Sequence, residues 1–394
     1  MNAGPLLFDA SHTSHTRAQT GIQRVCRSLF AELQVRENVL PVCFDPHFGD
    51  WRTLDRQESG SLADRTGAHA AASRGARWAL GQKIVGRVRR LAGHRGKLPP
   101  ARGLVCAELF SARVGRQLPR LFSPVSGPAV AVFHDAIGLR LPELTPPATV
   151  ARLPGYLREL LAFDGVAAVS EDSAMALRDF WHWLGVSNPP PVVAIPLGTD
   201  PVTLARPTMS TMRARVLCVA TIEGRKNHAA LLEAAELLWS EGAEFDLELI
   251  GLMRPATAES TVARARALKD SGRPVFLRGA VSDAALHEAY ARCSFTVYPS
   301  LLEGFGLPVI ESLRHGKPCV CANTGALGEA ARDGGCLTVD LPDASSLRLA
   351  MRRLLSEPVA RGQLADEARG RIFRGWSDYA GDLSDWMRSL PRRR

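Results

Sequence analysis

Two glutamates stand eight positions apart in "SLLEGFGLPVIESLRHGKP", residues 300–318. Glu303 precedes a Gly-Phe-Gly turn, and Glu311 follows the turn in a segment that reads as a short helix. Pro308 suits the first turn of that helix, where a missing N–H costs nothing. The glycines let the backbone approach a ligand, and the free N–H groups of a helix start favour an anion such as phosphate. Two acceptor carboxylates beside an anion site suit a ligand with a phosphate and several hydroxyls, such as a nucleotide sugar.

Each of these features also has a plainer interpretation. Glu311 alone could be a solvated glutamate on a helix surface, and Glu303 with its glycines could belong to an ordinary loop. A single glycine-rich turn is weak evidence for phosphate binding. The residues of this stretch therefore leave both interpretations open.

Arg225 and Lys226 form a second candidate cluster. They lie at the turn of "VLCVATIEGRKNHAALLEA", which reads as strand, turn and helix. Two cations at the carboxyl end of a strand can neutralise a diphosphate leaving group, although they could also be solvated turn residues. A third candidate is His134, beside Asp135 at the end of "AVAVFHD". A histidine there could act in binding or catalysis, but these residues alone favour a structural, hydrogen-bonded role.

The elements that must position these residues follow from the hydrophobic pattern. Short apolar runs alternate with helical patterns along almost the whole chain, which favours an α/β fold with parallel sheets. Buried strands are expected at 5–9, 39–44, 103–109, 129–135, 165–170, 215–220, 245–251, 275–279 and 294–300, and helices at 21–34, 171–184, 227–242, 259–272 and 282–293. A proline-rich passage at 188–201 holds one more strand and separates the two halves. Two doubly wound lobes in tandem follow, with ligands expected at the carboxyl ends of strands facing a cleft.

The composition agrees with two globular domains. The chain has 394 residues, of which 46% are hydrophobic and 23% charged, and it is too long for one core of ordinary size. It has no apolar run of the roughly 18 residues that a membrane span needs, so we expect a soluble, cytoplasmic protein. The close cysteine pair, Cys319 and Cys321, lacks metal-ligand spacing. We therefore predict buried, reduced thiols and no metal site.

The positive charge of the chain is concentrated in one stretch. The net charge is +9, and residues 65–102 contain ten Lys or Arg and no Asp or Glu. Within this stretch Leu80, Ile84, Val88 and Leu91 recur at helical spacing. The pattern is typical of a basic amphipathic helix on an anionic membrane surface, or of a helix packed on the protein with a solvated basic face. Nucleic acid is not expected as a partner, because no basic motif interleaved with aromatic residues is present.

The stretch "EGFGLPVIE", Glu303 to Glu311, resembles the E-x7-E signature of retaining glycosyltransferases of family 4. Further segments are similar to that family in the expected order between residue 6 and about residue 330: "TGIQRV", "VFHDAIGLRLPE", "VAAVSEDS", "VVAIPLGTD" and "TIEGRKNHAALLEA". The resemblance implies the GT-B fold, in which two tandem Rossmann-like, doubly wound α/β domains face a cleft. Residues 1–197 would form the acceptor-side domain and residues 198–375 the nucleotide-sugar-binding domain. Residues 376–394 would form a helix that crosses back to the first domain.

The resemblance also implies roles for individual residues. Glu303 would contact hydroxyls of the donor sugar near the reacting centre, and Glu311 would bind the ribose hydroxyls. Arg225 and Lys226 would hold the diphosphate. His134 would face the donor sugar and, with Glu303, make up the predicted catalytic pair. The remaining predicted donor-binding residues are Gly21, close to the phosphates, and the loop residues Gly304, Phe305, Gly306 and Leu307.

One departure from the family pattern affects the diphosphate site. Many members carry Gly-Arg directly after the first strand of the second domain, where this chain has Ala220 and Thr221. This leaves Arg225 as the candidate arginine, as in the members with an Arg-Lys-Asn turn.

The activity implied by the resemblance is transfer of a sugar from a nucleotide diphosphate to a hydroxyl, with retained anomeric configuration. No cofactor and no metal ion are expected, because no Asp-x-Asp follows a strand. The His-Asp strand end and the Arg-Lys-Asn turn look most like mannosyltransferases of surface-polysaccharide assembly. This implies GDP-mannose as donor and a glycan or lipid-linked glycan as acceptor. The basic stretch 65–102 would suit such an acceptor and a location at the inner face of the cytoplasmic membrane. The alternatives are a UDP-sugar-dependent glycosyltransferase, a phosphorylase, a nucleotide-sugar epimerase and a non-catalytic nucleotide-sugar-binding protein.

Overall fold

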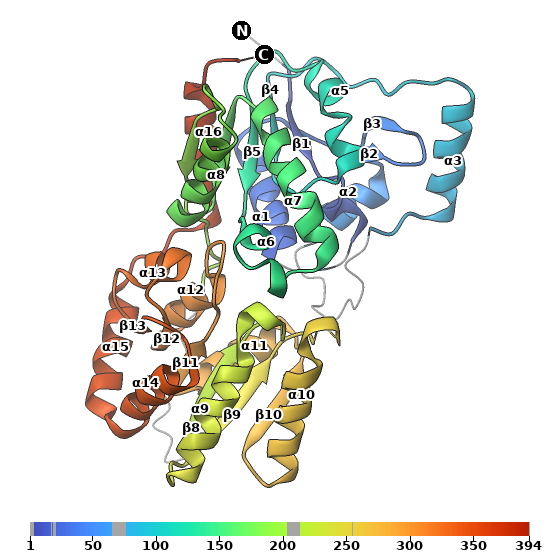
Figure 1. Ribbon diagram of the computed structural model, residues 1–394. Helices are drawn as coiled ribbons and strands as arrows, with labels where there is room; N and C mark the ends of the chain where they lie inside the picture. The colour runs from blue at the N-terminus through green and yellow to red at the C-terminus, as the bar shows by residue number, and fades with distance from the viewer. Residues whose placement is uncertain are drawn as a thin grey trace. The chain divides into compact units, whose positions relative to one another are not determined.

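The computed structural model describes residues 4–16, 18, 21–64, 76–202, 213–253 and 255–393. The chain forms two compact units (Figure 1). The first unit consists of residues 1–139, 147–198 and 374–394, and the second of residues 140–146 and 199–373. The domain boundaries predicted from the sequence lay at residues 197 and 375. The sequence did not predict that the short segment 140–146 belongs with the second unit.

The first unit is built around a seven-stranded sheet with the order β3-β2-β1-β4-β5-β6-β7. All neighbours pair in parallel except β3, which is antiparallel to β2. Its strands are β1 (Leu6–Asp9), β2 (Val39–Asp45), β3 (Asp50–Thr53), β4 (Gly103–Cys106), β5 (Ala129–Phe133), β6 (Gly165–Ala168) and β7 (Val192–Ala194). Its helices are η1 (Thr13–His15), α1 (Gly21–Arg36), α2 (Arg56–Ala63), α3 (Leu80–Leu91), α4 (Ala112–Gly115), α5 (Leu118–Phe122), α6 (Ile137–Arg140), α7 (Pro147–Glu159), η3 (Leu160–Ala162), α8 (Glu171–Trp183) and α16 (Trp376–Ser389).

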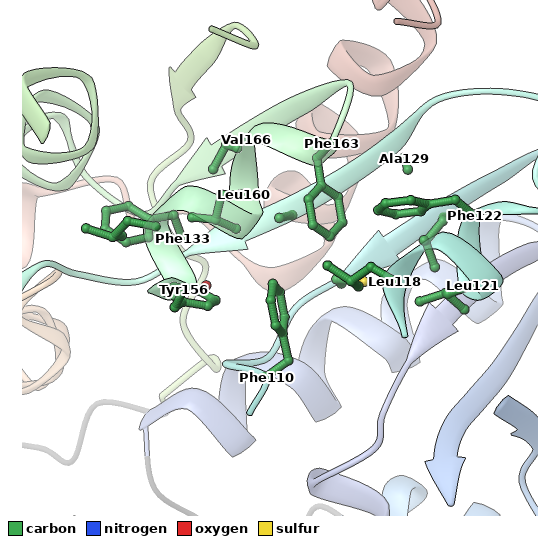
Figure 2. Packing of buried hydrophobic residues seen from close by; sticks show 14 of the residues in the cluster. Phe110, Leu118, Leu121, Phe122, Ala129, Phe133, Tyr156, Leu160, Phe163 and Val166 are labelled. Atoms are coloured by element: carbon green, nitrogen blue, oxygen red, sulfur yellow. The ribbon is translucent and has the colours of Figure 1, made fainter. Parts of the chain in front are cut away.

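An aromatic cluster fills the core of the first unit (Figure 2). The rings of Phe110 and Tyr156 meet edge to face at 4.9 Å, and those of Phe122 and Phe163 at 5.1 Å. Strand β5 is buried along its whole length, as expected for a parallel strand covered on both faces. On the same unit, α16 packs beside α1, where Arg36 Nη2 donates to the carbonyl oxygen of Ser377 at 2.8 Å.

The second unit contains a six-stranded, all-parallel sheet with the order β10-β9-β8-β11-β12-β13. Its strands are β8 (Ala214–Val219), β9 (Phe245–Ile250), β10 (Val275–Gly279), β11 (Phe295–Tyr298), β12 (Cys319–Ala322) and β13 (Cys336–Val339). Its helices are η2 (Pro142–Leu144), η4 (Gly224–Lys226), α9 (His228–Ser240), α10 (Pro255–Asp270), α11 (Asp283–Arg292), α12 (Leu307–Arg314), α13 (Gly325–Ala331), α14 (Ala344–Ser356) and α15 (Pro358–Gly370).

The predicted fold class, two doubly wound α/β lobes, is confirmed. The strand β3 was not predicted, because its sequence "DWRT" contains two charged residues and no apolar run. β3 lies at the edge of its sheet, and its two charged side chains are paired, Arg52 with Asp45 and Glu58, and Asp50 with Arg120.

The thiols are buried, as predicted, with the exception of Cys336, which is half-buried. Pairing of β12 with β13 places Cys319 opposite Cys336. As a result, the Sγ atoms of Cys319, Cys321 and Cys336 all lie within 4.8 Å of one another. The sequence did not predict this group of three thiols, because Cys336 lies on a different strand from the other two.

The predicted amphipathic helix is α3, while residues 65–75 of the basic stretch lie outside the described residues. The apolar side chains of α3 are open to solvent: Leu80 is 73% exposed, Val88 58% and Leu91 87%. α3 does pack on the protein, but through Gly86 and not through its apolar side chains, which stay exposed together with its arginines. Figure 1 shows α3 beyond β2 and β3, at that edge of the sheet. Among the described residues, none of the helices is both long enough and apolar enough to span a membrane.

Candidate functional site

The site of the second unit forms where β8 and β11 end. These strands are neighbours and parallel, so the loops that follow them leave the sheet at the same edge. The loop after β8 contains Arg225 and Lys226 in the short helix η4, and the loop after β11 contains Glu303. The backbone N–H of Leu301 donates to the carbonyl oxygen of Arg225 at 2.9 Å, which joins the two loops directly.

The side chains of these two loops form one ion-pair network. Arg225 Nη1 lies 3.1 Å from Glu303 Oε2, and Lys226 Nζ donates to Glu303 Oε1. Arg225 Nη2 lies 2.9 Å from Glu223 Oε1. Lys226 also donates to the hydroxyl of Tyr298 and lies 4.9 Å from the centre of its ring. We call Glu223, Arg225, Lys226, Tyr298 and Glu303 the cation cluster.

The cation cluster is largely enclosed by protein. Glu303 is 8% exposed and Lys226 is also 8% exposed. Burial alone would raise the pKa of Glu303, but the nearby charges of Lys226 and Arg225 outweigh it and lower the pKa to about 2. Burial lowers the pKa of Lys226, and the carboxylate of Glu303 opposes this shift. Glu303 is thus held as an anion across the neutral pH range.

Two members of this network were not predicted from the sequence, and a third, Glu303, has a different environment from the one predicted. Tyr298 and Glu223 were not predicted as site residues, although Tyr298 is the last residue of β11 and Glu223 stands two positions before Arg225. These positions could have identified both residues, because strand ends and the turns that follow neighbouring parallel strands lie at the same edge of a sheet. The prediction placed Glu303 at the mouth of the site, whereas the structure shows it paired and mostly buried.

The glycine turn and α12 have the local geometry that the sequence predicted. Gly306 precedes α12 with φ +94°, a left-handed conformation that glycine adopts without strain, and a Cβ there would lie 3.1 Å from Leu327 Cδ2. Pro308 lies in the first turn of α12, and Leu307 begins the helix. Gly304 and Phe305, in the turn, are half-buried.

Glu311 lies one turn into α12 and is half-buried. Its Oε2 lies 3.4 Å from the hydroxyl of Tyr290, the geometry of a weak hydrogen bond. Helix α12 therefore directs the positive end of its dipole toward the glycine turn that follows Glu303, and it carries a carboxylate in its second turn. This combination can accept hydrogen bonds from hydroxyls and donate to an anion.

One further residue beside the cation cluster was not predicted. His228, the first residue of α9, is 2% exposed, and both of its ring nitrogens lack a hydrogen-bond partner among the described residues. Burial, with a contribution from the charge of Lys226, lowers the pKa of His228 to about 3. The ring is therefore neutral at pH 7 and adds no third positive charge beside Arg225 and Lys226.

Two predicted site residues, His134 and Gly21, belong to the first unit. His134 follows β5 and is buried, and its Nε2 donates to the carbonyl oxygen of Ala107 at 2.9 Å. Burial lowers its pKa, so the ring is neutral at pH 7. Gly21 begins α1 and is exposed, and an added Cβ would meet no atom within 4 Å. The structure thus brings Arg225, Lys226 and Glu303 into contact, and it places His134 and Gly21 in the other unit.

The sequence of the second unit matches a known family. Residues 205–371 match the family model described as glycosyl transferases group 1. The chain is 26% identical over 353 residues to the serotype-specific mannosyltransferase WbdA of Escherichia coli, covering 83% of this chain and 40% of the relative. It is 29% identical over 211 residues to the MMP alpha-(1->4)-mannosyltransferase of Mycolicibacterium hassiacum, covering 52% and 50%. The chain thus spans half or less of the length of these two relatives.

Solved structures show the same fold over nearly the whole chain. Sucrose-phosphate synthase from Thermosynechococcus elongatus has a TM-score of 0.65 at 18% identity, covering 98% of both chains. Anabaena HepE in complex with UDP and glucose has a TM-score of 0.67 at 15% identity, covering 98% of this chain and 100% of that one. At these identities the likeness concerns the fold alone. The match to glycosyl transferases group 1 thus lies within the second unit, and the two Rossmann-like sheets have the GT-B arrangement of strands and helices.

Proposed function

We propose that this protein transfers a sugar from a nucleoside diphosphate to a hydroxyl group of an acceptor. The observation that carries the proposal is the cation cluster, in which Arg225 and Lys226 lie within ion-pair distance of Glu303 at adjoining strand ends. Two cations and a helix start suit the diphosphate, and the carboxylates Glu303 and Glu311 suit the hydroxyls of the sugar and the ribose.

In the proposed reaction, the bond between the anomeric carbon and the diphosphate oxygen breaks. The acceptor oxygen forms the new bond on the same face of the sugar, and its proton passes to the departing diphosphate. The charge that develops on the leaving oxygen would be stabilised by Arg225, Lys226 and the N–H groups at the start of α12. Retention of configuration rests on the segment from Glu303 to Glu311, which resembles the E-x7-E signature. His134 and the backbone N–H groups of the 304–307 turn complete the proposed donor contacts.

Mannose is the proposed sugar, with GDP-mannose as its donor. The support comes from the names of relatives: WbdA is a serotype-specific mannosyltransferase, and the Escherichia coli O-antigen chain mannosyltransferase B is 36% identical over 134 residues, 33% of this chain. The proposed acceptor is a glycan or a lipid-linked glycan of a surface polysaccharide. A UDP-sugar is the second candidate donor, since Anabaena HepE, which shares the fold, was solved with UDP and glucose.

Donor cleavage is the test of this proposal. Release of GDP from GDP-mannose and of UDP from UDP-glucose is measured with and without short mannosides as acceptors. Lys226→Ala should abolish release from whichever donor is active, whereas Lys269→Ala, an exposed lysine of the same unit, should leave it unchanged. Absence of release from every donor, together with tight nucleotide binding, would instead support a binding protein without turnover.

The proposed reaction needs no divalent ion, because Arg225 and Lys226 supply the positive charge that the leaving diphosphate requires. Transfer rates should therefore be the same, within about twofold, with millimolar EDTA and with millimolar magnesium or manganese. Loss of activity on chelation, restored by adding the metal, would contradict this part of the proposal.

We also propose that α3 places the protein at an anionic membrane surface, on the inner face of the cytoplasmic membrane. The support is the joint presence of an exposed apolar face, with Ile84 53% and Val88 58% exposed, and of basic residues on the same helix. Each cation close to such a surface contributes roughly 1 kcal/mol of attraction. The charge of the helix and the charge of the membrane are complementary.

The test replaces Lys83, Arg87 and Arg89 of α3 by Gln and measures binding to anionic vesicles at low salt. The matched control replaces Arg56, Arg158 and Arg178, exposed arginines elsewhere on the first unit, so both variants lose three charges. The α3 variant should bind vesicles at least about tenfold more weakly than the control variant. Equal binding by the two variants would rule out a specific membrane role for α3.

A further inference from the structure

The first unit contains a pocket of about 490 Å³ that the sequence did not predict. Three parts of the chain surround it: the end of α3 with the residues that follow, the turn between β2 and β3, and the α4–α5 segment. Its lining residues are Phe44, Phe48, Gly49, Asp50, Arg90, Gly93, His94, Arg95, Arg113, Arg116, Gln117 and Arg120. We call it the arginine pocket, because five of these residues are arginines.

The arginine pocket holds much more positive than negative charge. Asp50 is the one carboxylate among its described lining residues, and it lies 3.3 Å from Arg120 Nη1. The same carboxylate accepts hydrogen bonds from the backbone N–H groups of Trp51 at 3.0 Å and Gly96 at 3.1 Å. Asp50 is thereby occupied, and within the described parts of the chain the other four arginines of the pocket form no ion pair with a carboxylate.

The walls of the arginine pocket are fixed by packing. Figure 2 shows Leu118, Leu121 and Phe122 of α5 in the hydrophobic core, which holds the α4–α5 segment that carries Arg113, Arg116 and Arg120. The carbonyl oxygen of Gln117 accepts a hydrogen bond from Trp51 Nε1 at 2.9 Å. This bond ties the α4–α5 segment to β3.

In the opposite wall, two glycines allow α3 to lie close to the β2–β3 turn. At Gly86 of α3, an added Cβ would lie 2.9 Å from His47 Cβ and 3.0 Å from the Phe48 nitrogen, so α3 contacts the β2–β3 turn too closely for any side chain there. Gly49 has φ +81°, and the side chain of Arg90 passes over it. The helix therefore delivers Arg90 to the pocket while its apolar side chains remain exposed.

Five guanidinium groups around one open pocket repel one another, and water and salt relieve this repulsion only in part. A multiply charged anion that contacts several of them at once would relieve it more completely. Guanidinium groups match the oxygen geometry of phosphate and bind it through paired hydrogen bonds. The pocket volume is sufficient for a phosphate or diphosphate and the first atoms of the group attached to it.

We propose that the arginine pocket binds a phosphoryl group carrying two or more negative charges, as in a phosphomonoester or a diphosphate. The group could come from a lipid headgroup, because α3 presents its apolar face beside the pocket, or from a soluble phosphate compound. The idea that this phosphate compound is the acceptor of the transfer reaction rests on the proposed function, whereas the binding of a phosphoryl anion does not.

Inorganic pyrophosphate is the probe for the first experiment. It is titrated calorimetrically into the full chain in the presence of saturating GDP or UDP, so that a nucleotide site of the second unit is already filled. The double variant Arg95→Gln/Arg116→Gln should weaken pyrophosphate binding at least tenfold. The matched double variant Arg56→Gln/Arg158→Gln removes the same charge from exposed positions of the same unit and should change binding less than twofold.

Three results would overturn the proposal. Equal weakening by the two double variants would show an effect of net charge alone, and no weakening by the pocket variant would place pyrophosphate elsewhere. Chloride competing as well as pyrophosphate at equal ionic strength would remove the selectivity for phosphoryl groups. If neither nucleotide binds, the proposed function fails, and the comparison of the two variants with pyrophosphate alone still tests the pocket.

Vesicles distinguish the two sources of the phosphoryl group. Phosphatidylcholine vesicles are prepared with phosphatidic acid, which carries a phosphomonoester, or with phosphatidylglycerol, which carries a phosphodiester, at equal surface charge. Selective loss of binding to the phosphatidic acid vesicles by Arg95→Gln/Arg116→Gln supports a lipid headgroup. Unchanged vesicle binding together with weakened pyrophosphate binding supports a soluble ligand.

Discussion

The cation cluster of the second unit and the arginine pocket of the first unit gather positive charge in opposite ways. In the cation cluster, Lys226 and Arg225 are each paired with Glu303, and Lys226 is 8% exposed. In the arginine pocket the guanidinium groups are exposed, and Asp50 is the one carboxylate among the described lining residues.

The difference follows from the cost of removing a charge from water. A buried cation without a partner is strongly unfavourable, so Lys226 requires Glu303 close by. Exposed cations stay hydrated and need no carboxylate, but salt screens them. The cation cluster is therefore organised before any ligand arrives, whereas the arginine pocket gains most of its favourable interactions from a ligand.

After the loss of donor cleavage in Lys226→Ala, the largest expected effect is the loss of catalysis in Glu303→Gln. The substitution removes the carboxylate proposed to contact the sugar, so transfer should fall by about 100-fold or more. Affinity for the nucleoside diphosphate should stay constant or increase, because Arg225 and Lys226 lose a competing anion. Steady-state kinetics and calorimetry measure the two effects, with the exposed Glu259→Gln as control. Wild-type rates in Glu303→Gln would remove Glu303 from the reaction.

The enclosure of the cation cluster can be tested through His228, whose pKa is lowered to about 3 by burial. The unfolded chain, in which histidine titrates near 6.5, takes up the proton first as the pH falls. Stability should therefore decrease from pH 7 to pH 5 by about 2 kcal/mol through this residue, and be unaffected above pH 7.

Hydrogen exchange of the second unit, measured at pH 7 and at pH 5 and corrected for intrinsic rates, checks this expectation. His228→Gln should flatten the pH dependence, and the exposed His182→Gln of the first unit should not. An unchanged pH dependence in His228→Gln would mean that the ring is hydrated, and that the cluster beside it is more open than its burial indicates.

Glu311→Ala should have the reverse signature of Glu303→Gln. Its proposed contacts are with the ribose, so affinity for GDP or UDP should fall by about tenfold, in line with the loss of hydrogen bonds to a charged group. The transfer rate at saturating donor should change little. A large loss of kcat with unchanged nucleotide affinity would exchange the proposed roles of the two glutamates.

The smallest expected effect is the difference in salt dependence between the two sites. Between 50 and 200 mM salt, pyrophosphate binding at the exposed arginine pocket should weaken by about tenfold, and nucleoside diphosphate binding at the enclosed cation cluster by about threefold or less. Calorimetry at three salt concentrations measures both. Equal salt dependence would contradict the contrast in enclosure between the two sites.

Much of the fold and part of the site could be predicted from the sequence, because the relevant signals are local. Continuous apolar runs specify buried parallel strands, and the spacing of Leu80, Ile84, Val88 and Leu91 specifies α3. The order Gly306, Leu307, Pro308 predicts both the turn and the start of α12. Strand, turn and helix around Arg225 and Lys226 are likewise visible as a local pattern.

What only the tertiary structure decided is which side chains meet, because that depends on the order of strands in each sheet. β8 and β11 are adjacent although about 80 residues separate Arg225 from Glu303, and their adjacency creates the cation cluster. The same reasoning applies to the arginine pocket, whose arginines come from α3, the chain after it and the α4–α5 segment. Charge in a sequence is a sum over residues, but its effect depends on burial and distance, and these are fixed only when the strands pair and the helices pack.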